Sequence, residues 1–208
     1  MRSHDLSLFD PRLSTLREEL SAREKRFDPI PSKGGDRTHA AVSVILREGE
    51  EMELLLIKRA EAEGDPWSGQ MALPGGRRDP SDSSLLQTAM RETAEETDVL
   101  LAEHGVLLGR LEPTIPATVR LPPVTIFPFV FGVPDGAQAQ VSSREVDEVL
   151  WVPVTALQRP EMAGTVEIHY GDSSSRTFPC WRVGERVIWG LTYRILTGFF
   201  EILNATPP

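Results

Sequence analysis

Alternating and continuous apolar runs predict a strand-rich core that starts at Thr38. The runs cover residues 40–46, 53–58, 71–73, 107–111, 124–133, 148–154, 166–170 and 178–183. The run at 53–58 is apolar without interruption, so we expect a strand buried on both faces. Pro128 interrupts the run at 124–133 and predicts an edge position or a bulge, because proline cannot donate to a sheet hydrogen bond.

Helical patterns lie before, between and after these runs. They cover a charged segment at 14–26, an acidic segment that Ser83 or Ser84 caps, a short turn at 156–160, and an apolar segment at 187–203. Strands combined with a central and a terminal helix predict an α/β fold, in which a mixed sheet lies between helices as an α/β sandwich.

The chain of 208 residues suffices for one well-packed domain with extensions. We divide it into an N-terminal helical extension, residues 1–37, and a main domain, residues 38–208. The extension carries Leu16 and Leu20 on one side of its helix. It can act as a lid, as an arm that forms a homodimer, or as a loosely packed tail.

The net charge of −9 has no basic block to offset it, which argues against nucleic acid or a membrane surface as a partner. The one cysteine, Cys180, excludes an internal disulfide and suits a reducing compartment. No apolar run approaches the ~20 residues of a membrane span, and the first residues lack a secretory pattern. We therefore expect a cytoplasmic protein. A small anionic substrate stays open, because a bound metal can dominate the local charge.

One stretch, Leu73–Val99, joins a Pro-Gly-Gly turn to an acidic helix. On a helix, Glu92, Glu95 and Glu96 fall within about one third of the circumference, where like charges repel. A divalent cation between them removes that repulsion, and hard cations such as Mg²⁺ prefer carboxylate oxygens and substrate phosphates. We interpret the stretch as a metal site for diphosphate chemistry.

The alternative is a solvated helix face, for which Arg91 and Glu95 make a suitable i,i+4 pair. In the metal interpretation, Glu92 and Glu96 lie one turn apart and are the first ligands. Glu95 binds a second ion or acts through bound water, and Arg91 holds a carboxylate by a charge-assisted hydrogen bond. The missing side chain of Gly76 lets backbone groups approach the metal or a phosphate.

The same stretch resembles the Nudix box, which consists of a glycine, five residues, an acid and then Arg-Glu-x-x-Glu-Glu. Gly76 and Asp82 have the five-residue spacing, but eight residues separate Asp82 from Arg91 where the general box has seven. The longer gap resembles the coenzyme A diphosphatase branch. That branch pattern is matched by Pro74, Gly75, Gly76, Asp79, Asp82, Ser84, Leu85, Thr88, Ala89, Arg91 and Glu92. Further similar stretches extend the resemblance over roughly residues 40 to 203.

The resemblance implies a Nudix-type α/β/α sandwich and hydrolysis of a nucleoside diphosphate linked to another group, with Mg²⁺ or Mn²⁺. For coenzyme A the products are 3′,5′-ADP and 4′-phosphopantetheine. The alternatives are a Nudix pyrophosphatase for ADP-ribose or another nucleoside diphosphate derivative, and a catalytically idle Nudix domain that binds a nucleotide or a protein. The clustered glutamates favour an enzyme.

The implied site residues fall into three groups. The catalytic group is Arg91, Glu92, Glu95 and Glu148. The metal group is Glu92, Glu95, Glu96 and Gly76, and the substrate group is Arg59, Trp67 and Gly75. Nudix enzymes often place a further acid near the metals, so Glu148 is favoured over its neighbours Glu145 and Asp147. The alternative for these acids is a plain acidic entrance to a strand.

Some positions depart from the resemblance. Gly64 stands where the coenzyme A signature has an arginine, and Gly69 comes one residue late. These changes favour the ADP-ribose alternative. Thr93 replaces an apolar residue, and Asp98 replaces a glycine at the helix end, where it must adopt a left-handed conformation.

Overall fold

The computed structural model describes residues 11–27, 38–64, 67–116, 124–169 and 174–205. Seven strands form one mixed sheet. They are β1 (Thr38–Arg47), β2 (Glu53–Arg59), β3 (Met71–Ala72), β4 (Gly75–Arg77), β5 (Val106–Arg110), β6 (Val124–Val133) and β7 (Val146–Pro153). The pair β1 and β6 is parallel, and the other pairs are antiparallel.

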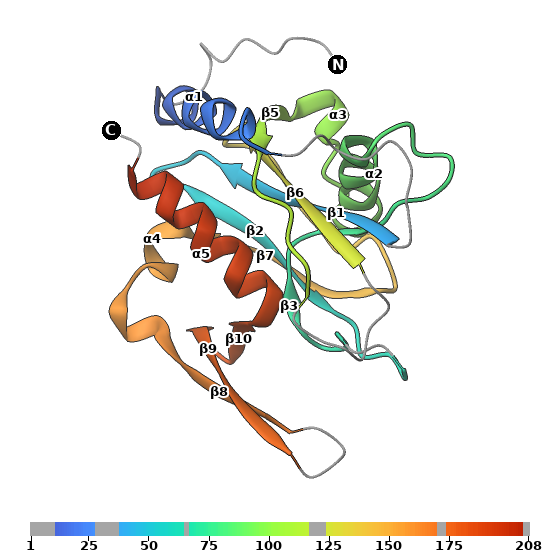
Figure 1. Cartoon of the computed structure of the whole chain (residues 1–208), viewed down its shortest axis with the longest axis vertical. Coiled ribbons are helices and arrows are strands. Elements are labelled where there is room, and N and C mark those ends of the chain that lie inside the picture. Colours follow the sequence, from blue (N-terminus) through green and yellow to red (C-terminus); the bar gives the residue numbers. More distant parts are fainter. Residues whose placement is uncertain (1–10, 28–37, 65–66, 117–123, 170–173, 206–208) are drawn as a thin grey trace.

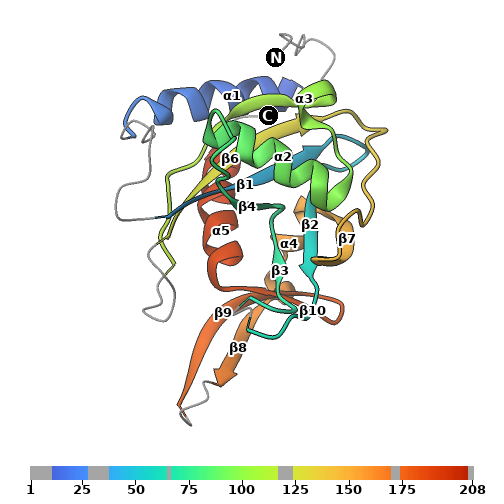
Figure 2. The same cartoon turned by 90° about the vertical axis from the view of Figure 1, so that its right-hand side faces the viewer.

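Helices cover both faces of this sheet (Figures 1 and 2). One face carries α2 (Leu85–Thr97) and α3 (Leu101–His104), and the other carries α1 (Pro11–Glu24) and α5 (Gly190–Ala205). This arrangement confirms the expected α/β sandwich with a mixed sheet. Within the described ranges, no helix has the length and apolarity that a membrane crossing requires.

A second sheet of three strands joins the main body beside β3. It consists of β8 (Ala163–His169), β9 (Ser175–Val183) and β10 (Arg186–Trp189), and it follows the short helices α4 (Val154–Leu157) and η2 (Pro160–Met162). The ribbon formed by β8 and β9 projects away from the sandwich (Figure 1).

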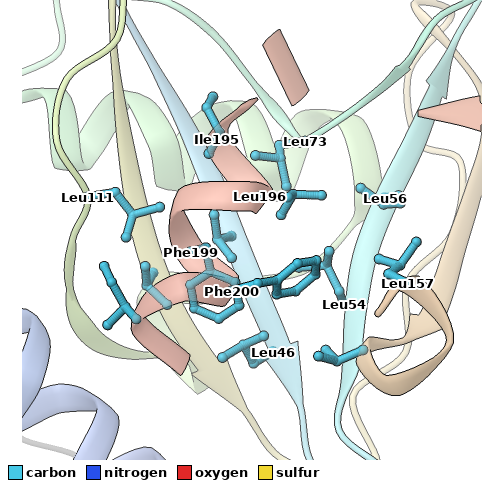
Figure 3. Close-up of a cluster of buried hydrophobic side chains, with 14 of the residues drawn as sticks. Leu46, Leu54, Leu56, Leu73, Leu111, Leu157, Ile195, Leu196, Phe199 and Phe200 are labelled. Atoms are coloured by element: carbon cyan, nitrogen blue, oxygen red, sulfur yellow. The ribbon is translucent and has the colours of Figure 1, made fainter. Parts of the chain in front are cut away.

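Each face of the main sheet has its own hydrophobic cluster. Figure 3 shows part of the larger one, in which Leu196 and Phe199 of α5 pack over the sheet face that carries Leu46 of β1 and Leu54 of β2. The smaller cluster joins α2 to the opposite face. Strand β2 contributes to both clusters, which confirms the strand buried on two faces.

Helix α1 belongs to the larger cluster. Leu13, Leu16 and Leu20 are each 0% exposed. Gly109 and Gly132 allow this approach, since a Cβ at either would lie 2.8 Å from a side-chain atom of Leu20 or Leu13. The packing argues against a loosely packed tail, while the division at residues 37 and 38 stays a prediction.

Two sequence-based expectations were wrong. Strand β6 lies between β1 and β5, so Pro128 is not on an edge strand, and the irregular pairing lies at Leu107–Gly109 of β5. The last pair of β5 with β6 is Arg110–Phe129, so Pro128 lies just beyond it, where its carbonyl oxygen accepts a hydrogen bond from the N–H of Leu111. The segment 187–203 is not one helix, since β10 runs through Trp189 and α5 begins at Gly190, whose φ is 64°.

The strands β1 and β2 pair only where Leu46 meets Leu54 and Arg47 meets Glu53, and they diverge beyond that point. The short strands β3 and β4 occupy the gap, with β3 on β2 and β4 on β1. This insertion brings the Pro-Gly-Gly segment under helix α2.

Candidate functional site

Helix α2 carries the acidic cluster, and local signals define both of its ends. Ser84 caps the start, because its hydroxyl accepts a hydrogen bond from the backbone N–H of Gln87 at 3.1 Å. Asp98 ends the helix in the left-handed region at φ 60°. Both observations agree with the sequence-based expectations, and they fix where the helix that presents the glutamates begins and ends.

Strand β4 lies directly against this helix. A Cβ on Gly76 would lie 2.5–2.6 Å from the carboxyl atoms of Glu92, so only glycine leaves room for that side chain. A Cβ on Gly75, whose φ is 149°, would lie 2.3 Å from the carbonyl oxygen of Ala41. The two glycines therefore permit close contact on opposite sides, one with the helix and one with β1.

Glu96 is the most deeply buried acid of the cluster, at 3% exposure. Its carboxylate accepts a hydrogen bond from the backbone N–H of Gly75 at 2.8 Å. Burial raises the pKa of Glu96 to about 8, and the negative charge of Glu92 adds to this effect. Such a carboxyl in a Gly-lined site is a strong candidate for a cation ligand.

Glu92 and Glu95 lie nearer the surface and are drawn to Arg91. The Arg91 guanidinium lies 2.9 Å from Glu92 and 3.1 Å from Glu95. Burial also raises the pKa of Glu92, although Arg91 opposes the effect. The Glu95 side chain is 57% exposed. The predicted role of Arg91, which is to hold a carboxylate, therefore has a structural basis.

Asp82 anchors that arginine, a function that sequence analysis did not assign to it. Its side chain is 1% exposed and accepts hydrogen bonds from Arg91 Nε and Nη2, both at 3.0 Å. Thr88 donates to the same carboxylate at 2.8 Å. Arg91 holds the pKa of Asp82 down to about 2, so the carboxylate stays charged. The spacing of Asp82 within the motif was the available signal.

The predicted substrate residues lie at the end of β2 and in the loop that follows. The positive charge of Arg59 lies close enough to Glu96 to oppose part of the rise in its pKa. Trp67 is partly buried, and its carbonyl oxygen accepts a hydrogen bond from Gln70 at 3.2 Å. Arg59 and Gly75 thus adjoin the acidic cluster, while residues 65–66 beside Trp67 lie outside the described residues.

The structure distinguishes the acids at the start of β7. Glu148 accepts a hydrogen bond from Arg186 of β10 at 2.7 Å and lies 3.7 Å from Lys58. In contrast, the negative charge of Glu145 contributes to the raised pKa of both Glu92 and Glu96. The catalytic role of Glu148 stays a prediction. Glu145 is a second candidate for that role, because its charge acts on the acidic cluster.

No three His, Cys, Asp or Glu side chains in the described part of the chain already converge into a group that could hold a metal ion. The donor chemistry still fits a hard divalent cation, because Glu92 and Glu96 are neighbouring carboxyls whose buried charges repel. Arg91 draws two of the three glutamates aside, so their side chains must turn toward Glu96 to share one ion.

Comparisons with known proteins agree with this geometry. The NUDIX domain family matches residues 37–169. The uncharacterized Nudix hydrolase NudL of Yersinia enterocolitica is 31% identical over 190 residues, which cover 91% of this chain. The mitochondrial coenzyme A diphosphatase of Homo sapiens is 32% identical over 133 residues, which cover 63% of this chain. The chain spans 94% of NudL, 54% of the human protein and 39% of an uncharacterized protein of Schizosaccharomyces pombe.

A solved structure shares the fold. The MutT/nudix family protein from Enterococcus faecalis superposes with a TM-score of 0.55 at 20% identity, covering 90% of this chain and 69% of that one. The family match and the similarity to NudL show the class: the chain belongs to the NUDIX domain family and is a Nudix hydrolase, which acts on pyrophosphate bonds.

Proposed function

We propose that the protein hydrolyses the diphosphate of coenzyme A or an acyl derivative, giving 3′,5′-ADP and (acyl-)4′-phosphopantetheine. The observation that carries this proposal is the contact between Gly75 and buried Glu96, formed by a motif with the eight-residue gap before Arg91. The similarity to the human coenzyme A diphosphatase supports the same substrate.

Nudix hydrolases generally need a divalent metal, and we propose Mg²⁺ or Mn²⁺ with Glu92, Glu95 and Glu96 as its ligands. When bound, such a cation would neutralise charge on the diphosphate and would lower the pKa of the attacking water. Residues of the chain position the carboxylates that would bind the cation. Gly76 leaves space for the Glu92 carboxylate, and the backbone N–H of Gly75 orients Glu96.

A carboxylate must also accept the proton that the attacking water loses. Glu95 and Glu148 are the candidates that the sequence favours, and the action of the Glu145 charge on Glu92 and Glu96 supports Glu145 as a third. Arg59 supplies a positive charge beside the acids, which favours an anionic substrate at this place.

ADP-ribose, or another nucleoside diphosphate derivative, is the second candidate substrate. Gly64 supports it, because this residue replaces the arginine of the coenzyme A signature.

A substrate panel decides between these proposals. Coenzyme A, acetyl-CoA, ADP-ribose, NADH and diadenosine polyphosphates are each incubated with the purified protein and Mg²⁺ or Mn²⁺. We expect the highest kcat/KM on coenzyme A or acetyl-CoA, and Glu96→Gln serves as the inactive control. A higher kcat/KM on ADP-ribose would overturn the coenzyme A assignment. No turnover on any substrate would instead favour an idle binding domain.

A further inference from the structure

A pair of buried hydroxyl groups joins β1 to helix α2 behind the acidic cluster. Ser43 and Thr93 are both 0% exposed. Thr93 Oγ1 donates to Ser43 Oγ at 2.9 Å, and Ser43 Oγ donates to the carbonyl oxygen of Ala89 at 3.3 Å. Thr93 directly follows Glu92, at a position where the Nudix box has an apolar residue.

The same serine also holds the glycine segment. The backbone N–H of Ser43 donates to the carbonyl oxygen of Pro74 at 2.8 Å. The next residue, Gly75, donates its N–H to Glu96, which lies one helical turn after Thr93. Three hydrogen bonds therefore connect β1, the Pro-Gly-Gly segment and the acidic helix in pairs: Thr93 to Ser43, Ser43 to Pro74, and Gly75 to Glu96. These three elements lie side by side in Figure 2.

We propose that Ser43 and Thr93 are positioning residues, which set the distance between the glycine segment and the glutamates of α2. An apolar contact is non-directional and permits a helix to slide or rotate slightly, whereas a hydrogen bond needs a defined distance and angle. The hydroxyl pair thus fixes the rotation of α2 on β1. The effect on catalysis rests on the proposed function, but the geometric effect does not.

Three variants separate positioning from stability. Thr93→Val keeps the shape but removes the hydroxyl, and Ser43 keeps its acceptor on Ala89. We expect kcat to fall roughly ten- to hundredfold with little change in KM, because small displacements of catalytic groups are costly. Thr93→Ser keeps the hydroxyl but loses a methyl group. It should lower Tm and yet retain kcat within about threefold of the wild type.

The double variant Ser43→Ala with Thr93→Val removes both hydroxyl groups. Because neither hydroxyl group is then left without the other, its Tm should stay close to that of Thr93→Val, and kcat should stay low. Thr192→Val is the matched control, because this threonine also joins a helix to a strand. Its Oγ1 in α5 donates to the carbonyl oxygen of Met71 in β3 at 3.1 Å. Its kcat should not change.

Amide exchange of the metal-free protein provides a measurement that needs no substrate. In Thr93→Val, we expect the Gly75 amide to exchange roughly tenfold faster, while amides of β6 stay unchanged. The proposal is overturned if this exchange rate is unaltered, or if kcat follows Tm across the three variants. If the wild type hydrolyses nothing, the proposed function fails, and amide exchange alone decides this inference.

Discussion

Glu96 is the residue at which stability and function oppose each other. Its raised pKa means that the folded state holds a proton that the unfolded chain releases at a lower pH. The stabilising contribution of this proton is fully present below pH 4.5, the ordinary pKa. It declines as pH rises toward about 8, where the buried carboxyl ionises. A bound cation reverses this cost, because it favours the charged form.

We therefore predict that Glu96→Gln nearly abolishes hydrolysis and yet stabilises the metal-free protein at pH 8 and above. The gain should be a few kcal/mol and should vanish below pH 4.5. Urea unfolding over a pH series measures it. Saturating Mg²⁺ or Mn²⁺ should raise the Tm of the wild type but not of the variant.

Glu95→Gln is the matched control for this prediction, because Glu95 is exposed and its substitution removes no buried charge. Its unfolding free energy should differ from the wild type by less than ~0.5 kcal/mol at every pH. If Glu96→Gln kept activity within a few-fold of the wild type, the assignment of Glu96 as a metal ligand would be wrong.

The acids at the start of β7 offer a second prediction at this scale. Glu145→Gln should lower kcat by about a hundredfold if Glu145 accepts the proton of the attacking water. Its charge acts on Glu92 and Glu96, which places it beside the acidic cluster. Glu148→Gln should mainly loosen the contact with Arg186. Parallel kcat measurements on the two variants check this. The opposite ranking would support the sequence-based choice of Glu148.

Glu145 and Glu148 illustrate which site residues can be predicted from the sequence and which cannot. Spacing along one helix placed Glu92 and Glu96 together, because helical geometry is local. The choice between Glu145 and Glu148 depends on which one Arg186 pairs with, and that residue lies 38 positions away. Asp82 could be recognised from the motif, but its bidentate contact with Arg91 could not.

Among the secondary-structure elements, strand β4 consists of only two glycines and an arginine. We predict that Gly76→Ala lowers kcat by about a hundredfold with little loss of Tm. The three atoms nearest to the new Cβ belong to the flexible end of Glu92, which can move away. Circular dichroism and thermal melting would show an intact fold, and an active variant would contradict the proposed placement of Glu92.

Gly75→Ala is the contrasting change in the same strand. Its Cβ would lie 2.3 Å from the backbone oxygen of Ala41 and 2.6 Å from the Cα of Val42, at a φ that favours glycine. We expect a loss of at least ~2 kcal/mol in unfolding free energy together with activity. A stable, active variant would show that this backbone contact is dispensable.

Sequence patterns predicted the existence of most elements and missed those that depend on distant pairing. Strand β4 was expected only as a turn, because its partner on β1 is 35 residues away at the Ala41–Gly76 pair. Strand β10 was absorbed into a helical pattern, since Ile188 fits helical spacing and also pairs with Trp181. The Pro128 expectation was wrong because the place of Pro128, just beyond the last pair of β5 with β6, also depends on distant pairing.

At the scale of the whole molecule, the two faces of the sheet have separate tasks. The face with α2 carries the candidate site, and its cluster is the smaller one. The opposite face, with α1 and α5, carries the larger cluster. Substitutions in the larger cluster should therefore change stability without changing the substrate preference.

Leu16 tests whether the N-terminal helix is part of this larger core. It is fully buried, so Leu16→Ala should cost about 2–5 kcal/mol and lower Tm by several degrees. The tryptophans all lie outside α1, at residues 67, 151, 181 and 189, so their fluorescence reports on the rest of the molecule. We expect one shifted, cooperative transition by fluorescence, and no shift in the exposed control Glu18→Ala. A tryptophan transition that Leu16→Ala leaves unchanged would show instead that α1 unfolds on its own, as a dispensable extension.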